Sequence, residues 1–124
     1  MLGKKYPSKV EHHADLCKEL NDLYARKNHD YGDSFHQSFV EEGLAMSRIR
    51  LGDKFNRFKT LSRATEKKVT DESIRDTLID LANYAIMTVL EMEVAREKRE
   101  SSAVSGYSEV GHGRTSEHGL RGNV

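Results

Sequence analysis

The hydrophobic and polar positions between Asp71 and Met92 separate as they would on two faces of one α-helix. The apolar positions recur at steps of three and four residues: Ile74, Leu78, Leu81, Ala85, Val89 and Met92. A second row lies roughly 160–240° around the helix axis from Ile74 and contains Glu72, Asp76, Asp80, Asn83 and Met87. The pattern predicts a long helix that begins at Thr70 or Asp71, either of which is a suitable N-cap.

The segment from Tyr84 to Met92 is apolar nearly all the way round, which is typical of a buried helix. Three long helices alone would leave much of this segment exposed. We therefore expect it to be covered by a short helix near residues 36–43 or by a second copy of the chain. Pairing into a homodimeric bundle is the arrangement we favour.

Two further long helices are predicted before this one. The first begins after Ser8, which forms a capping box with Glu11, and its apolar stripe contains Val10, Ala14, Cys17, Leu20 and Tyr24. Cys17 is therefore interpreted as a buried, inert thiol. The second runs from about Leu44 to Ala64, with an apolar stripe of Leu44, Leu51, Phe55 and Phe58. Ala45 and Ile49 lie on another side of it, among Asp53, Asn56 and Thr60, which indicates that this side is also partly covered.

The helical pattern fails between Arg26 and Phe35, where Asn, Asp and Gly are turn-forming residues. We expect a tight bend at Gly32 that brings together Lys27, Asn28, Asp30 and Tyr31. Such a loop suits a ligand, with lysine for phosphate and tyrosine for a ring. A helix C-cap and connector, in which Lys27 only interacts with the negative helix end, is the alternative, and composition does not decide between them.

Apolar periodicity is lost from Ser101, and five of the nine glycines follow it. We predict an all-α domain over residues 8–97, a bundle of three long helices and a short one, and a flexible tail over residues 98–124. The 20 basic and 20 acidic residues balance, so no global field draws the chain to duplex nucleic acid or a membrane. With no secretory signal, and no apolar run near the ~18 residues of a membrane span, a cytoplasmic location is expected.

The acidic row of the third long helix is the strongest candidate for chemistry. Carboxylates stacked along one face repel one another unless a cation lies between them, and Asp53 of the preceding helix could face them. Oxygen ligands select Mg²⁺ or Mn²⁺, and a metal-bound water can attack a phosphoryl group. Lys27, Arg57 and Lys54 would then neutralise phosphate oxygens. The alternative is a solvated acidic face, with Asp53 and Arg57 forming a surface pair one turn apart.

His29-Asp30 resembles the dipeptide of the histidine–aspartate phosphohydrolases. Those enzymes also need another histidine and a later aspartate, for which His12 or His13 and Asp80 would have to serve. We set this interpretation aside, because a lone dipeptide in a predicted turn is weak evidence.

Three ordered motifs resemble the family known as nucleotide modification associated domain, type 1, over about residues 8–95. They are Leu23-Tyr24-Ala-Arg-Lys27-Asn28-His-Asp30-Tyr31-Gly32, Asp53-Lys54-Phe-Asn-Arg57, and the stretch from Asp71 to Tyr84. This family is common in bacteriophages, and the resemblance implies a role beside enzymes that make or handle modified nucleotides for phage DNA. If the chain is phage-encoded, the host cytoplasm is its expected location.

More distantly, the helical layout is similar to the all-α nucleoside triphosphate pyrophosphatases, the superfamily of MazG and the dimeric dUTPases. Those enzymes bind Mg²⁺ through Glu-x-x-Glu on one helix and Glu-x-x-Asp on the next. The similarity matches Asp80 to the aspartate of the second motif and Asp53 to a carboxylate of the first. Thr77 and Asn56 stand where these enzymes carry the other carboxylates.

Two functions follow from the resemblance. The first is an Mg²⁺- or Mn²⁺-dependent pyrophosphohydrolase of (modified) deoxynucleoside triphosphates. Its metal ligands would be Asp53, Glu72, Asp76 and Asp80, of which Asp53, Asp76 and Asp80 would be catalytic. Its substrate-binding residues would be Lys27, Asn28, Asp30, Tyr31, Arg57 and Asn83. The second is a non-catalytic nucleotide-binding or adaptor protein that partners a nucleotide-modifying enzyme, motivated by the departures at Thr77 and Asn56.

Overall fold

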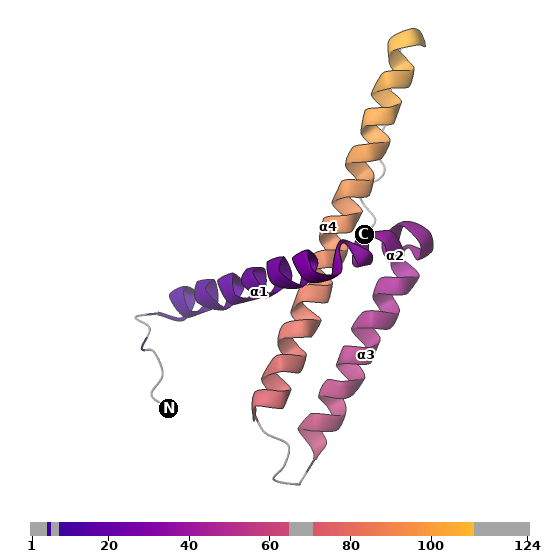
Figure 1. Ribbon diagram of the computed structural model, residues 1–124. Coiled ribbons are helices and arrows are strands. Elements are labelled where there is room, and N and C mark those ends of the chain that lie inside the picture. Colours follow the sequence, from indigo (N-terminus) through magenta and orange to yellow (C-terminus); the bar gives the residue numbers. More distant parts are fainter. Residues whose placement is uncertain (1–4, 6–7, 65–70, 111–124) are drawn as a thin grey trace. The chain divides into compact units, whose positions relative to one another are not determined.

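The computed structural model describes residue 5, residues 8–64 and residues 71–110, without the side chains of Tyr31 and residues 105–110. This part of the chain is all-α, as predicted, and consists of α1 (Lys9–Tyr31), α2 (Ser34–Glu42), α3 (Leu44–Arg63) and α4 (Asp71–Val110) (Figure 1). The chain divides into a first unit, Met1–Glu91, and a second unit, Met92–Val124, and α4 continues from one into the other. No helix in the described ranges is both long and apolar enough to cross a membrane.

Helix α1 begins where the sequence predicts and ends later. The Ser8 side chain accepts a hydrogen bond of 3.1 Å from the backbone N–H of Glu11. The predicted loop from Arg26 is wrong, because the helix continues through Tyr31 and stops at Gly32, which has a φ of 68°. Asn, His and Asp cost a helix only about 0.7 kcal/mol each at most relative to Ala, so they do not end it. A positive φ does.

The short helix expected near residues 36–43 is α2, and Gly43, again with a φ of 68°, separates it from α3. The Gly43 N–H donates a hydrogen bond of 2.8 Å to the Phe39 carbonyl oxygen. The bounds of α3 agree with the predicted helix to within one residue. The expectation that its second side is partly covered is wrong for the single chain, since Ile49 is 62% exposed and Ala45 is also exposed.

Helix α4 begins at Asp71, as predicted, and residue 70 lies outside the described residues. The predicted flexible tail over residues 98–124 is not seen in its first part, because α4 extends to Val110. The added segment contains no proline and a single glycine, Gly106, which costs a helix about 1 kcal/mol and need not end it. The rest of the predicted tail, residues 111–124, lies outside the described residues.

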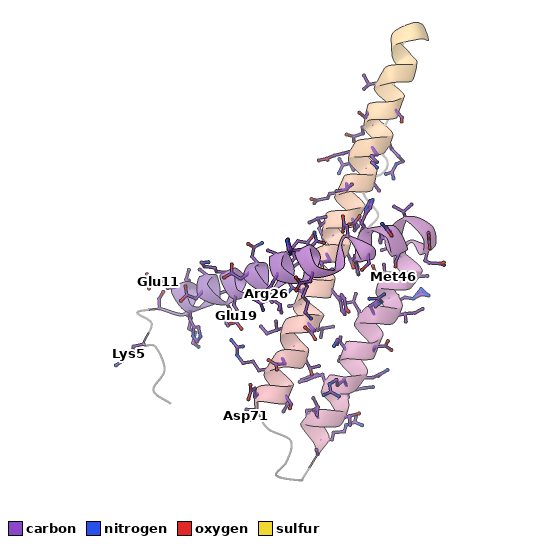
Figure 2. The ribbon with its side chains drawn as sticks, viewed as in Figure 1. Lys5, Glu11, Glu19, Arg26, Met46 and Asp71 are labelled. Atoms are coloured by element: carbon purple, nitrogen blue, oxygen red, sulfur yellow. The ribbon has the colours of Figure 1, made fainter. Side chains whose placement is uncertain are left out.

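The described core of the first unit is small and partly polar. Its buried hydrophobic side chains are Phe35 and Met46, the latter on α3 (Figure 2). Its buried polar side chains are Ser47, Thr77, Thr88 and Glu91. Thr88 Oγ1 lies 2.9 Å from Ser47 Oγ and 2.8 Å from the Tyr84 carbonyl oxygen, so hydroxyl groups satisfy one another at the contact of α4 with α3.

The face of α4 that is buried in the first unit is therefore not the predicted apolar stripe. Leu78 and Val89 of that stripe are 40% and 53% exposed. The reason is that Thr77 and Thr88 can bury their hydroxyl groups at no hydrogen-bond cost, because each bonds the carbonyl oxygen four residues earlier. The prediction of a buried Cys17 is also wrong, since this thiol is exposed, with His13 Nδ1 3.7 Å away.

Candidate functional site

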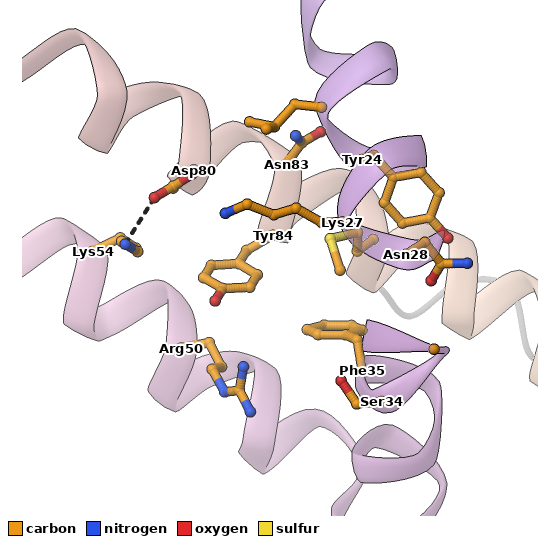
Figure 3. Close-up of a pocket in the computed structure, with 13 residues that line it drawn as sticks. Tyr24, Lys27, Asn28, Ser34, Phe35, Arg50, Lys54, Asp80, Asn83 and Tyr84 are labelled. Atoms are coloured by element: carbon orange, nitrogen blue, oxygen red, sulfur yellow. Dashed lines mark hydrogen bonds and ion pairs between the residues drawn. The ribbon is translucent and has the colours of Figure 1, made fainter. Parts of the chain in front are cut away.

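A cavity of about 270 Å³ lies in the first unit, where the end of α1 and the start of α2 meet the facing sides of α3 and α4 (Figure 3). Each helix contributes side chains because of its local spacing. Tyr24, Lys27 and Asn28 follow one face of the last turns of α1, and Arg50 and Lys54 are one turn apart on α3. The positive φ at Gly32 turns the chain so that α2 can bring Ser34 and Phe35 to the same cavity.

Positive charge exceeds negative charge among the side chains that line this cavity. Among the described residues that line it, the cations are Lys27, Arg50 and Lys54, and the one carboxylate is Asp80. Lys54 Nζ lies 2.8 Å from Asp80 Oδ2, and both side chains are less than one-third exposed. That pair is neutral as a whole, so Lys27 and Arg50 leave the cavity with two positive charges in excess. Such an excess favours an anionic ligand.

Aromatic rings form another wall of the cavity. The rings of Phe35 and Tyr84 are stacked, with centroids 5.9 Å apart and an interplanar angle of 18°. The guanidinium carbon of Arg50 lies 5.9 Å from the centroid of Tyr84, within the range of a cation–π interaction. Figure 3 shows these groups around the same space as Lys27. A flat ring and a phosphate could therefore be bound side by side.

Two amides add hydrogen-bonding capacity. Asn28 and Asn83 both line the cavity, and Asn83 Nδ2 donates a hydrogen bond of 3.2 Å to the Leu20 carbonyl oxygen. This bond ties α4 to α1 and fixes the amide's orientation. The pKa of Tyr24 is raised, chiefly by burial and then by the negative charges of Asp33 and Glu91. Its phenol therefore stays protonated at neutral pH and can donate a hydrogen bond.

The structure brings together four of the residues predicted for the site: Lys27, Asn28, Asp80 and Asn83 line this cavity. Asp30 and Arg57 are exposed and do not line it, and Asp30 instead lies 3.5 Å from His29. Tyr31 ends α1, and its side chain is outside the described part of the chain.

Sequence reasoning missed Arg50 and the aromatic residues Tyr24, Phe35 and Tyr84 as lining residues. It named Lys54 as a phosphate ligand without foreseeing its bond to Asp80. A signal for Arg50 was available, because it stands four residues before Lys54 and therefore on the same helix face.

The four predicted metal ligands do not form a cluster among the described residues. Asp53, Glu72 and Asp76 are exposed, and Asp80 already has Lys54 as its counter-ion. None of the four belongs to a group of three or more His, Cys, Asp or Glu side chains with ligand atoms within 4.8 Å of one another, as far as the described residues go. Asp76 and Asp80 do line a common, wider groove between α1 and α4. Their binding of Mg²⁺ stays a prediction.

The surface alternative for Asp53 is seen in part: Asp53 and Arg57 lie on an exposed face, but the ion pairs of the described residues do not include one between them. One group of side chains does meet the 4.8 Å criterion in the described ranges, and it consists of Asp33, His36 and Glu91. Sequence reasoning did not single out any of these three residues.

Comparison with known proteins identifies one family. The model of nucleotide modification associated domain 1 matches residues 27–92, which is more than half of the chain. Of the residues that line the cavity, only Leu23 and Tyr24 precede the matched region. No curated protein and no solved structure matches the chain. The more distant similarity to the all-α pyrophosphatases is not confirmed.

Proposed function

Because the chain belongs to the nucleotide modification associated domain 1 family, we propose that it binds a nucleotide in the cavity formed by α1, α2, α3 and α4. The family description connects the chain with nucleotide modification. The observation that carries the proposal is a pair of cations, Lys27 and Arg50, that have no ion-pair partner among the described residues and lie beside the stacked rings of Phe35 and Tyr84. A nucleotide combines the two features that such a site recognises, an anionic phosphate and a flat aromatic base.

We assign the phosphate to Arg50 and Lys27. A guanidinium group can donate two parallel hydrogen bonds to phosphate oxygens, and a lysine adds a point charge. The neutral Lys54–Asp80 pair would keep the intervening carboxylate from repelling the phosphate. Asn28 and Asn83 can both donate and accept hydrogen bonds, which suits the edge of a base or a sugar hydroxyl.

Hydrolysis is a separate step, and it is supported by one observation. Asp76 and Asp80 line the same groove, and both Asp80 and Lys27 also line the cavity. A divalent ion held by these carboxylates would lie close to a phosphate bound by Lys27. Since Lys54 already balances Asp80, nucleotide binding without turnover is the function that the charges support better.

Calorimetric titration of the full chain with deoxynucleoside mono- and triphosphates at low salt tests the proposal. Arg50→Ala should weaken binding at least tenfold, because a hydrogen bond to a charged group contributes about 1.5–3 kcal/mol and tenfold is about 1.4 kcal/mol. Arg48→Ala is the matched control, because Arg48 belongs to the same helix, is exposed and does not line the cavity. It should change the affinity less than twofold.

The proposal is wrong if no nucleotide binds at millimolar concentration, or if the two arginine variants weaken binding equally. The same samples, supplied with Mg²⁺, can be assayed for pyrophosphate. Release that Asp76→Asn abolishes would add hydrolysis to binding. Binding without release would favour the non-catalytic protein that assists a modifying enzyme.

A further inference from the structure

A second group of side chains lies near the turn between α1 and α2. His36 Nδ1 is 2.6 Å from Glu91 Oε1, and a carboxylate oxygen of Asp33 lies within 4.8 Å of the ligand atoms of both. Asp33 and His36 come from the start of α2, and Glu91 comes from α4, fifty-five residues after His36. The close approach is therefore made by the packing of the first unit rather than by one helix.

The position of the Asp33 carboxylate is unusual for its place in the chain. Asp33 is the N-cap residue of α2, where an aspartate ordinarily accepts a hydrogen bond from the second or third N–H of the helix. Here the side chain makes no capping hydrogen bond. Its carboxylate lies instead near an imidazole and a second carboxylate. Exchanging a capping hydrogen bond for the approach of two negatively charged carboxylates raises the free energy of the folded state unless a cation is also present.

Glu91 provides the second, independent observation. It is only 6% exposed, and its hydrogen bond to His36 uses Oε1. Among the described residues, Glu91 Oε2 has no hydrogen-bond partner. An imidazole supplies at most one positive charge against two carboxylates, so the group does not carry a net positive charge, and one of its carboxylates, that of Glu91, is buried. The negative charges of Asp33 and Glu91 also help to raise the pKa of Tyr24, which places both carboxylates near one phenol.

We propose that Asp33, His36 and Glu91 form a binding site for a divalent first-row transition ion such as Mn²⁺ or Zn²⁺. One imidazole nitrogen with carboxylate oxygens is a ligand set that suits these ions, whereas Mg²⁺ prefers oxygen ligands alone. The ion takes the place of the hydrogen bond between His36 Nδ1 and Glu91 Oε1, and the metal-bound imidazole is neutral, with its proton on Nε2. His36 is partly exposed and Asp33 is exposed, which leaves the site open to solvent.

The inference does not rest on nucleotide binding, although the two sites are neighbours in the chain. Gly32, Ser34 and Phe35 line the cavity, while Asp33 and His36 belong to the metal group. A test with the metal alone therefore separates the two proposals.

The metal-free full chain is titrated with Mn²⁺, and the electron paramagnetic resonance signal of the free ion measures binding. A second titration, with Zn²⁺, is measured by calorimetry. We expect one ion per chain, with Asp33→Asn and Glu91→Gln each weakening binding at least tenfold. His29→Ala is the matched control, because His29 also lies beside an aspartate, Asp30, at 3.5 Å, but on an exposed surface. It should leave the affinity within twofold.

Because Glu91 is buried, the circular dichroism of Glu91→Gln is compared with that of the parent chain. Asp33 is exposed, so Asp33→Asn remains informative if Glu91→Gln does not fold. The proposal is overturned if neither ion binds at millimolar concentration, or if a folded Asp33→Asn binds as the parent chain does. A loss of binding in Asp80→Asn alone would also overturn it, by placing the ion at the carboxylates of α4.

Discussion

Glu19 and Arg75 illustrate how single residues join the helices of the first unit. The guanidinium group of Arg75 on α4 donates hydrogen bonds of 2.8 and 2.7 Å to the two carboxylate oxygens of Glu19 on α1. Figure 2 labels Glu19. These hydrogen bonds, more than the charge of Arg75, lower the pKa of Glu19. Neither residue was predicted to form this contact, because they are fifty-six positions apart.

This pair predicts a stability difference that depends on pH. Glu19→Gln should reduce the free energy of unfolding at pH 7 by less than about 1 kcal/mol, since both side chains are nearly half exposed. The folded-state pKa lies below the ordinary value of 4.5, so the contribution is complete above pH 4.5 and is lost as the pH falls through the lowered pKa. Urea unfolding of both proteins at several pH values measures the difference.

Asp22→Asn is the control for that experiment. Asp22 pairs with Lys18 within α1, one turn away and largely exposed, so its removal should have an effect of only a few tenths of a kcal/mol. A Glu19→Gln difference that does not diminish at any pH below 4.5 would contradict the role given to Arg75.

At the scale of elements, the ends of the helices depend on a few residues with special backbone angles. Gly32 has φ 68° and ψ −161°, a region that is essentially restricted to glycine. No atom within 4 Å would meet a Cβ added there, so the cost of a substitution is a backbone cost alone. The Lys27–Tyr31 segment was misjudged because turn-forming residues were counted, whereas this single torsion angle ends the helix.

Substitution by alanine should therefore change the free energy of unfolding in opposite directions at Gly32 and at Gly52. Gly32→Ala should lower the free energy of unfolding by about 1–3 kcal/mol, because alanine is strained at this torsion angle. Gly52→Ala should raise it by about 0.5–1 kcal/mol, since Gly52 lies inside α3, also with nothing within 4 Å of an added Cβ. Thermal or urea unfolding of the two variants gives the comparison. Equal signs for the two changes would show that the assigned end of α1 is wrong.

At the scale of the whole molecule, more of the large hydrophobic side chains described in the first unit are exposed than are buried. Leu78, Ile86 and Val89 on α4 are 40%, 52% and 53% exposed, while the buried hydrophobic residues described are Phe35 and Met46. Small cores are commonly completed by oligomerisation. The predicted apolar stripe of α4 is therefore the surface on which we expect a second copy of the chain to pack.

Sedimentation equilibrium should accordingly give twice the chain mass of 14.1 kDa at micromolar concentration. Val89→Lys should shift the equilibrium towards the monomer, because a lysine charge would be buried between the copies. Val40→Lys on α2 is the control, since Val40 is 67% exposed and belongs to another helix. A mass of 14.1 kDa at every concentration would contradict the expectation.

The sequence by itself determined the helical class and most helix starts. A capping side chain at Ser8 and the change to a helical period at Asp71 are local signals, and local hydrogen bonds fix them. It also named Lys27, Asn28 and Asn83 as substrate-binding residues and Asp80 as a metal ligand, and these four residues line one cavity.

Only the tertiary structure decided which face of α4 is buried, what balances Asp80 and which residues meet across the chain. Periodicity marks an apolar stripe but does not show which helix packs beside it. Thr88 is buried beside Ser47 of α3, and Glu91 is buried beside His36 of α2. In the sequence Asp80 and Asp76 are equivalent carboxylates, but in the structure Lys54 of α3 lies beside Asp80. The approach of His36 to Glu91 depends on the turn at Gly32 and on helix packing, which no local pattern encodes.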